Sequence, residues 1–337
     1  MSQLDRSEID ALIAGADWRQ RWEILPGIFT SGVSDIDPKY ILDEFGVPED
    51  LTGKRCIDIG AWDGALTFEL ERRGGTVLAA DIQHPDATAF NTARTILGSK
   101  VDYLQASVYD LPDLLAGQEF DVVIFRAVWY HLKNPIGAFE AISRISAAGA
   151  ILCSEGEILR YYAEDMSGHP IDSALIGQLA DLDVPITLCY PGTYKGGENW
   201  FVPNVACFRG WMTACGFEIV QDRIWEDHSL NGQRLIVTCV RTTNNIAVEH
   251  TVLDKGWRKQ TDSTSKVVKG QLIRNSRLST VAAATEAAGK TPEASTPSNA
   301  GTSKAKPASQ AGSKAGSGNS KPAAPKSGAS KAKKPKA

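Results

Sequence analysis

Two features that would class a protein at a glance are missing from this sequence of 337 residues. No apolar run is long enough to span a bilayer, so we expect no membrane partner. The first ten residues carry more acidic than basic side chains and lack the basic start and apolar stretch of a signal peptide. We therefore expect a cytoplasmic protein.

Cysteine pairs are missing as well. The six cysteines include no C-x-x-C pair, and no two cysteines or histidines have the spacing of zinc ligands. Several cysteines lie inside apolar runs, which predicts reduced, buried thiols and no metal site. They are Cys56, Cys153, Cys189, Cys207, Cys215 and Cys239.

Val, Ile, Leu and aromatic residues are absent from residues 290–337, which hold ten lysines and one acid. Such a segment cannot bury enough apolar surface to offset the entropy of ordering, so we predict a disordered tail. Of the 36 basic and 40 acidic residues in the chain, the tail takes a net charge of +9 and leaves residues 1–289 with −13. The tail either contacts polyanions weakly, in a salt-dependent way, or is solvated without a specific partner.

The dinucleotide fingerprint G-x-G-x-x-G is also missing, although residues 54–81 have the strand, loop, helix and strand pattern that would surround it. The loop instead reads acid-x-Gly-x-x-x-Gly, with Asp58, Gly60 and Gly64, and the second strand ends on Asp81. This pattern suits a ligand with no phosphate and a cationic end. S-adenosylmethionine is such a ligand, and the glycines would let the backbone approach it closely.

Each part of that ligand has a candidate contact. Asp58 can face the ammonium of the methionine part, and Asp81 can accept both ribose hydroxyls. After the third predicted strand, the side chain of Ser107 and the backbone amide of Val108 can address the adenine edge.

Strands and helices alternate after an N-terminal extension, residues 1–50, which has predicted helices at 7–15 and 38–46. The alternation predicts a parallel sheet covered on both faces. It is interrupted at residues 156–204, rich in aromatic residues, proline and glycine, which we interpret as a lid and acceptor insertion. Residues 244–289 are a poorly defined extension. Predicted strands are 55–59, 76–80, 101–106, 121–126, 149–154, 217–224 and 233–241, and predicted helices are 64–73, 86–97, 135–146 and 204–215.

The motifs at the strand ends, together with residues 107–112 and 120–123, resemble those of the class I S-adenosylmethionine-dependent methyltransferases. The resemblance covers roughly residues 50–240 and assigns residues 51–243 to a methyltransferase domain. It implies an α/β fold with a doubly wound, Rossmann-like sheet of seven strands and a terminal antiparallel pair. The N-terminal helical extension and the disordered tail flank this domain. The resemblance also implies S-adenosyl-L-methionine as the cofactor.

A closer resemblance, carried by residues 128–135 and 198–204, is to the branch that contains the bacterial tRNA wobble-uridine carboxymethyltransferases. That branch uses a carboxylated S-adenosylmethionine, whose extra carboxylate needs basic partners. Its tyrosine matches Tyr130, but its upstream lysine has no counterpart near residues 26–29. Because an unpaired buried carboxylate would be costly, we predict ordinary S-adenosylmethionine.

The candidate general base is His131, which follows the fourth strand; the alternative is that it packs under the cofactor or holds the loop. Tyr130 beside it can orient the acceptor or contact the cofactor. Arg126 is a candidate substrate clamp or an ion-pair partner. In the lid, Tyr194 and Trp200 are candidate pocket walls for the acceptor, with ordinary packing as the alternative.

These assignments predict methyl transfer to oxygen or nitrogen of a small or medium-sized acceptor. One alternative is (carboxy)methyl transfer to the wobble uridine of tRNA. The acidic body counts against it, because phosphate binding needs a basic face, although the tail could compensate. Another alternative is a catalytically silent cofactor-binding or scaffold protein that interacts through its tail.

Overall fold

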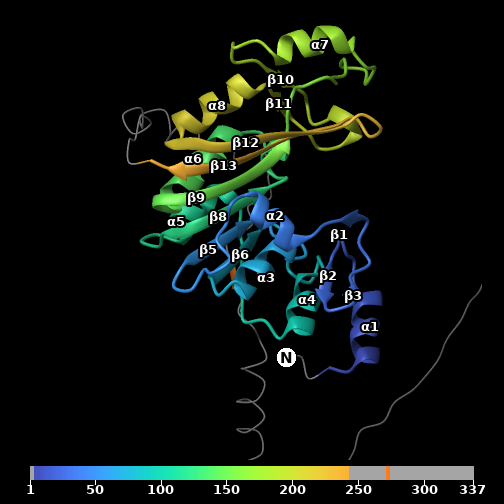
Figure 1. Ribbon diagram of the computed structural model, residues 1–337, viewed down its shortest axis with the longest axis vertical. Coiled ribbons are helices and arrows are strands. Elements are labelled where there is room, and N and C mark those ends of the chain that lie inside the picture. Colours follow the sequence, from blue (N-terminus) through green and yellow to red (C-terminus); the bar gives the residue numbers. More distant parts are fainter. Residues whose placement is uncertain (1–3, 243–270, 274–337) are drawn as a thin grey trace, which may run out of the picture. The chain divides into compact units, whose positions relative to one another are not determined.

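The computed structural model describes residues 4–242 and 271–273 (Figure 1). The chain divides into two units, residues 1–283 and residues 284–337, and all described residues lie in the first. The predicted disordered tail, residues 290–337, lies outside the described residues.

A mixed sheet of eight strands forms the centre of the first unit (Figure 1). In spatial order the strands are β12 (Phe217–Asp227), β13 (Gly232–Arg241), β9 (Ser146–Glu157), β8 (Phe120–Arg126), β5 (Arg55–Ile59), β6 (Thr76–Asp81), β7 (Asp102–Gln105) and β14 (Gln271–Ile273). The strands β5 to β9 are parallel, and β13 runs antiparallel to both β9 and β12. The chain order reverses between β5 and β8, which is where doubly wound sheets bind ligands.

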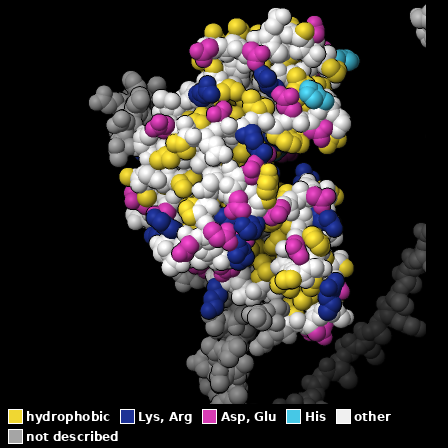
Figure 2. All heavy atoms as spheres, viewed as in Figure 1, with side chains coloured by type: hydrophobic (Ala, Val, Ile, Leu, Met, Phe, Trp, Pro, Cys, Tyr) yellow, Lys and Arg dark blue, Asp and Glu magenta, His cyan; other side chains and the backbone are white. Residues whose placement is uncertain are grey.

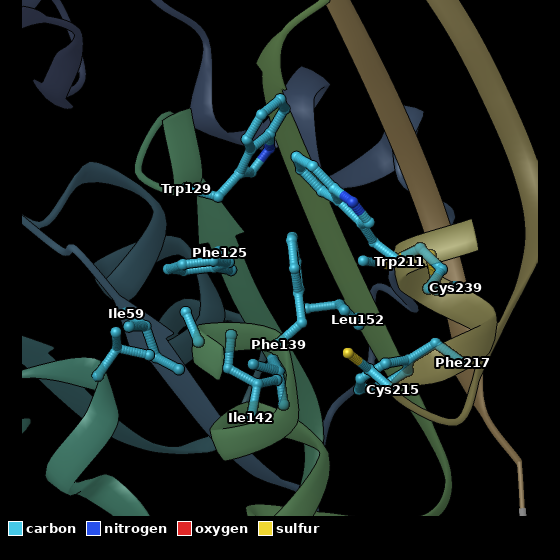
Figure 3. Packing of buried hydrophobic residues seen from close by; sticks show 14 of the residues in the cluster. Ile59, Phe125, Trp129, Phe139, Ile142, Leu152, Trp211, Cys215, Phe217 and Cys239 are labelled. Atoms are coloured by element: carbon cyan, nitrogen blue, oxygen red, sulfur yellow. The ribbon is translucent and has the colours of Figure 1, made fainter. Parts of the chain in front are cut away.

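Helices cover both faces of the sheet. They are α1 (Arg6–Ala14), α2 (Pro38–Glu44), α3 (Ala65–Arg72), α4 (Phe90–Leu97), α5 (Leu111–Leu114), α6 (Pro135–Ile145) and α8 (Val205–Ala214). Because side chains alternate along a strand, Ile57 of β5 enters the apolar cluster with α5, α6 and α8, whereas its neighbour Cys56 enters the cluster with α1 to α4. Figure 3 shows the first cluster, where Phe125 of β8, Phe139 of α6 and Trp211 of α8 meet.

The N-terminal extension contains the two predicted helices and, in addition, four short strands that the sequence did not predict. α1 begins with a capping box in which Asp5 and Glu8 each accept a hydrogen bond from the other's backbone N–H. The short strands are β1 (Gln20–Arg21), β2 (Glu23–Leu25), β3 (Ile28–Phe29) and β4 (Ser34–Asp35), paired β1 with β4 and β2 with β3. Trp18 and Trp22 anchor this segment in the cluster of α1 to α4.

The insertion predicted at residues 156–204 lies between β9 and α8 and has an apolar cluster of its own. We keep the name lid for its residues 158–203. Its elements are α7 (Ser173–Ala180), β10 (Thr187–Cys189), the short 3-10 helix η3 (Tyr194–Gly196) and β11 (Phe201–Pro203). Asn204 joins the lid to α8. Its Oδ1 accepts from the backbone N–H groups of Ile186 and Cys207, and its Nδ2 donates to the carbonyl of Val184.

The predicted doubly wound sheet of seven strands with a terminal antiparallel pair is confirmed. The eighth strand, β14, was not predicted; it pairs antiparallel with β7 and comes from the extension at residues 244–289, the rest of which lies outside the described residues. In the part of the chain that the structure describes, no helix combines the length and apolar character needed to cross a bilayer.

Candidate active site

At two positions, the loop after β5 has a backbone conformation that favours glycine. Gly60 has a φ of 82° and Gly64 a φ of 88°, both in the left-handed region. A Cβ on Gly60 would lie 2.4 Å from Cγ2 of Val128, and one on Gly64 would lie 2.5 Å from Cε2 of Phe68. The loops after β5 and β8 therefore meet at the point where the strand order reverses. The predicted glycine loop lies there.

Asp58 is a buried acid directly before this loop. Only 4% of its surface is exposed, and its Oδ2 accepts a 2.6 Å hydrogen bond from Oγ1 of Thr67 in α3. Burial raises the pKa of Asp58 to about 7, and the nearby Asp81 adds to the rise, against the opposing effects of Thr67 and Arg126. A cationic group beside Asp58 would reverse that shift.

Asp81 ends β6, next to the same loop. Its Oδ2 accepts from the backbone N–H of Trp62 at 3.0 Å, and its Oδ1 accepts from that of Gln83 at 2.9 Å. Burial raises the pKa of Asp81, and these backbone donors oppose the rise. Trp62 holds a left-handed φ of 49° and exposes 40% of its surface.

The N-terminal extension is hydrogen-bonded to the glycine loop through Asp63. The Oδ2 of this buried acid accepts from the backbone N–H groups of Arg19 at 3.2 Å and Gln20 at 2.8 Å. Burial raises the pKa of Asp63 to about 6. Residues of the extension are thus fixed against the cofactor side of the sheet, a contact that sequence reasoning did not find.

The predicted adenine contacts follow β7. Ser107 caps a short 3-10 helix, η1 (Val108–Asp110), by accepting from the backbone N–H of Tyr109 at 3.4 Å. The side chain of Val108 is buried. Both residues lie at the carboxyl end of the parallel strands, as the predicted site requires, and their contact with adenine stays a prediction.

Tyr130 and His131 lie in a short 3-10 helix, η2 (Trp129–His131), after β8. Their ring centroids are 4.2 Å apart. Nδ1 of His131 is 3.0 Å from the carbonyl oxygen of Glu198, so we assign the proton to Nδ1, which leaves Nε2 as an acceptor. Although His131 is exposed, desolvation lowers its pKa, with Arg234 and Arg19 adding to the effect and the hydrogen bond to the Glu198 carbonyl opposing it. The imidazole is therefore neutral near pH 7.

Arg126, the candidate clamp, forms an ion pair with Glu155 of β9, its partner in the register of β8 and β9. This contact matches the ion-pair alternative, and binding of substrate by Arg126 stays a prediction. Ala127 after it has a left-handed φ of 58°, a strained conformation for a residue with a Cβ. The strain lies between β8 and the Tyr130–His131 turn.

Three charged side chains meet where the lid contacts the sheet, and the sequence did not predict this cluster. Glu157 of β9, whose side chain is 4% exposed, pairs with Lys195 of the lid. Nε of Arg234 in β13 lies 3.7 Å from the same carboxylate. The guanidinium of Arg234 lies 4.7 Å from the ring centroid of Tyr130, and Nη1 of Arg234 has no hydrogen-bond partner among the described residues. Three elements far apart in sequence thus bring two cations to one buried carboxylate.

The two predicted acceptor contacts in the lid differ in exposure. Tyr194 is fully buried in the lid's own cluster, and its hydroxyl accepts from Nε2 of Gln233 at 3.1 Å. This packing gives it no exposed surface, so its predicted contact with an acceptor stays a prediction. Trp200 is half-buried, with Nζ of Lys133 4.8 Å from its ring centroid. Its backbone N–H donates to the carbonyl of Tyr130 at 2.8 Å, which brings it to the candidate base.

The arrangement combines two acids beside a backbone-lined loop with a neutral histidine on the neighbouring strand end. The acids can hold a ligand with an ammonium group and paired hydroxyls, and Nε2 of His131 can accept a proton. Within residues 4–242, no group of three or more His, Cys, Asp or Glu side chains is arranged to hold a metal ion.

Comparison with known proteins gives one family. Residues 57–154 match the family described as "Methyltransferase domain". Over 151 residues the chain is 29% identical to a ubiquinone biosynthesis O-methyltransferase of Dechloromonas aromatica, a match that covers 44% of this chain and 62% of the relative. Over 120 residues it is 31% identical to a tRNA U34 carboxymethyltransferase of Helicobacter pylori, covering 35% of this chain and 38% of the relative. The chain thus spans less than two thirds of the length of these relatives.

Among solved structures, an S-adenosylmethionine dependent methyltransferase from Mesorhizobium loti is similar with a TM-score of 0.44 and 17% sequence identity. The similarity covers 61% of this chain and 98% of that chain.

Proposed function

We propose that this chain, whose residues 57–154 match the methyltransferase domain family, transfers a methyl group from S-adenosyl-L-methionine to oxygen or nitrogen of a small or medium-sized acceptor. The observation that carries the proposal is the pair of buried acids, Asp58 and Asp81, beside a loop whose glycines lie in contact with neighbouring side chains. A phosphate-bearing cofactor would be repelled by this pair, whereas a ligand with an ammonium group and ribose hydroxyls fits the donors and acceptors present.

The residues act by binding, alignment and proton removal. When bound, S-adenosyl-L-methionine supplies a methyl group already activated by its sulfonium. Asp58 holds the ammonium group and Asp81 the ribose hydroxyls of the cofactor, and the lid side chains exclude water from the acceptor. Alignment of this kind lowers a barrier by roughly 7–11 kcal/mol. Nε2 of His131 takes the proton from an acceptor hydroxyl or amine, which adds about 10²–10⁴-fold.

A second candidate is (carboxy)methyl transfer to the wobble uridine of tRNA, the first alternative from the sequence. Arg234 favours it, because a partly buried arginine beside Tyr130, whose Nη1 has no hydrogen-bond partner among the described residues, could pair an extra carboxylate even without the upstream lysine. Against it, acidic and basic side chains are interspersed over the face shown in Figure 2, without a broad basic area for a phosphate backbone. Weak contact of polyanions with the basic tail is a separate part of this proposal.

The compartment is proposed on chemical grounds alone. All six cysteines are free thiols, and five of them are buried. Free thiols are typical of the reducing cytoplasm, which is the localisation that we propose.

The first test is cofactor binding, measured by isothermal titration calorimetry with S-adenosyl-L-methionine. We expect wild-type protein to bind and Asp81→Ala to bind at least about tenfold more weakly, because charge-assisted hydrogen bonds to ribose hydroxyls contribute about 1.5–3 kcal/mol. The matched control is Asp222→Ala, which removes an aspartate of β12 far along the chain from the glycine loop and should leave the affinity unchanged. Absence of binding in wild-type protein would refute methyl transfer from S-adenosyl-L-methionine to either acceptor and favour the scaffold alternative.

The second test separates the two acceptors. Purified protein is incubated with S-adenosyl-L-methionine labelled on its methyl group and with either the small-molecule or the tRNA fraction of a host extract. Label in the small-molecule fraction supports the first candidate. Label in tRNA, together with wobble nucleosides that change in a deletion strain by mass spectrometry, would replace it with the second.

A further inference from the structure

We propose that the ion pair between Lys195 and Glu157 is a positioning device that fixes the proton of His131 on Nδ1 and so keeps Nε2 free as the base. The inference rests on the proposed function, because only a methyl acceptor that loses a proton needs that nitrogen. Its structural part, the placement of the proton, can be tested without any acceptor.

The first step is the contact between the lid and the histidine. Nδ1 of His131 donates to the backbone carbonyl of Glu198 at 3.0 Å. A carbonyl oxygen can only accept, so a neutral imidazole in this position must carry its proton on Nδ1. The neighbouring bond, from the backbone N–H of Trp200 to the carbonyl of Tyr130 at 2.8 Å, ties the same two segments together.

The second step is the turn that presents this carbonyl. Residues 194–200 form a compact turn in which the backbone N–H of Gly197 at 3.2 Å and Nδ2 of Asn199 at 2.8 Å both donate to the carbonyl of Tyr194. The position of the Glu198 carbonyl therefore depends on how the start of this turn is held.

The third step concerns the contacts that fix the start of this turn. Lys195 has a left-handed φ of 55°, a conformation that a lysine adopts only when its surroundings fix it. Its backbone N–H donates to Oε2 of Glu164 at 3.0 Å, and its Nζ donates to Glu157 and to the carbonyl of Asn231. The last two contacts reach β9 and the residue before β13, so one side chain ties the turn to the central sheet.

The environment makes this tie strong. Glu157 is 4% exposed at its side chain and Lys195 is 21% exposed, so water screens the pair weakly. Removal of one partner from a buried pair leaves the other charge uncompensated, which is why such pairs hold a single geometry. Burial raises the pKa of Glu157, and the charges of Arg234 and Lys195 oppose the rise. Nε of Arg234 lies 3.7 Å from the same carboxylate, but Arg234 belongs to β13 and not to the lid, so it cannot replace the lysine as the tie.

The central variant is Lys195→Asn. Asparagine tolerates the left-handed backbone, so this change removes the ion pair without adding strain. The readout is nitrogen NMR of protein labelled at its five histidines, with the His131 signals assigned by a His131→Gln spectrum. We expect wild-type protein to show the Nδ1–H tautomer, and Lys195→Asn to lose about half or more of that population to the Nε2–H form.

The controls separate the tie from general damage. Lys54→Gln breaks an exposed lysine–aspartate pair, with Asp121, outside the lid and should leave the tautomer of His131 unchanged. Lys195→Arg should restore the Nδ1–H population, because arginine can pair with Glu157. If Lys195→Asn does not fold, Glu157→Gln keeps the packing and a hydrogen-bond acceptor while removing the charge. We expect it to shift the tautomer toward Nε2–H as well, by less than Lys195→Asn.

An unchanged tautomer in a folded Lys195→Asn or Glu157→Gln variant would overturn the inference. This outcome is distinct from failure of the proposed function, which calorimetry of wild-type protein with S-adenosyl-L-methionine decides by itself. A folded Lys195→Asn variant that keeps the wild-type cofactor affinity and changes its tautomer supports the positioning role. A shift of the tautomer in Lys54→Gln as well would assign the effect to net charge and refute it.

Discussion

At the scale of single residues, Asp58 is the group whose charge state depends most on what occupies the site. Its carboxyl is buried, has a single side-chain hydrogen bond, from Thr67, and lies close enough to Asp81 to be affected by that second acid. Both effects of burial and like charge favour the protonated form. An ammonium group beside Asp58 favours the ionised form, so ligand binding and proton release are linked.

We therefore predict that affinity for S-adenosyl-L-methionine rises with pH between 6 and 8. With a pKa of about 7 in the free protein, Asp58 is mostly protonated at pH 6 and must lose its proton on binding. The apparent affinity at pH 6 should then be about tenfold weaker than at pH 8. Calorimetry in buffers of different ionisation enthalpy measures both the affinity and the released proton.

Two variants check the assignment of this pH dependence. Asp58→Asn should bind weakly with a flat profile. Thr67→Val removes the hydrogen bond that lowers the pKa of Asp58, so the rise in affinity should move to higher pH. The pKa of His131 is already lowered, so it stays neutral over most of this range. A flat wild-type profile from pH 6 to 8 would contradict the prediction.

Residues that are close together in the sequence could be predicted, and residues brought together by the fold could not. Asp58, Gly60 and Gly64 lie in one short stretch at the end of β5 and in the loop after it, where spacing alone reports the backbone conformation. Lys195 and Arg234 come from the lid and from β13, and each is an ordinary basic residue in its own stretch. The pairing of β9 with β13 brings Arg234 to Glu157, and the fold of the lid brings Lys195 there. No local sequence pattern reports either contact.

At the scale of elements, the lid is attached to β13 mainly through one buried amide. Oε1 of Gln233 accepts from the backbone N–H groups of Arg160, Tyr161 and Tyr162, at 3.0–3.2 Å. Its Nε2 donates to the carbonyl of Tyr162 and to the hydroxyl of Tyr194. Glutamine is suited to this place because its amide offers an acceptor and two donors on one planar group.

We predict that Gln233→Leu lowers the free energy of unfolding by about 3 kcal/mol. Leucine fills a similar volume but leaves the three N–H groups and the tyrosine hydroxyl without this partner, and each partly buried group costs about 1–3 kcal/mol when left unpaired. Urea unfolding followed by circular dichroism gives the value. Gln118→Leu, which removes an exposed hydrogen bond to Arg55, should change stability by less than about 0.5 kcal/mol. Equal effects of both substitutions would contradict the anchoring role.

Helices and strands were predictable where a long apolar pattern ends at a residue that terminates the element. The strand at Arg55–Ile59 was predicted with the observed bounds, because an apolar run follows a basic start and ends at Gly60. The four short strands of residues 20–35 were missed. They are held by tertiary contacts, including the bonds of Asp63 to the backbone of Arg19 and Gln20, which no periodicity reports. Strands of two or three residues are too short to show alternation.

At the scale of the whole molecule, the net charge differs in sign between the main part of the chain and its C-terminal tail. Residues 1–289 have a net charge of −13, whereas residues 290–337 have +9. An acidic body repels nucleic acid, and a lysine-rich segment without aromatic residues attracts it without reading bases. Any affinity for polyanions should therefore belong to the tail and fall steeply with salt.

Deletion of residues 290–337 tests this division. Because the segment lacks the apolar residues needed for a core, its removal should shift the midpoint of thermal unfolding by less than about 1 °C and leave the affinity for S-adenosyl-L-methionine unchanged. Binding to a single-stranded oligonucleotide at low salt, followed by fluorescence anisotropy, should be lost. Replacing the ten lysines by glutamine in the full chain is the matched control, since it removes the charge and keeps the length.

If the deletion lowered the unfolding midpoint by several degrees, the tail would take part in the fold. If the oligonucleotide bound equally well without it, the acidic body would have to contain a basic face of its own, which would strengthen the tRNA alternative.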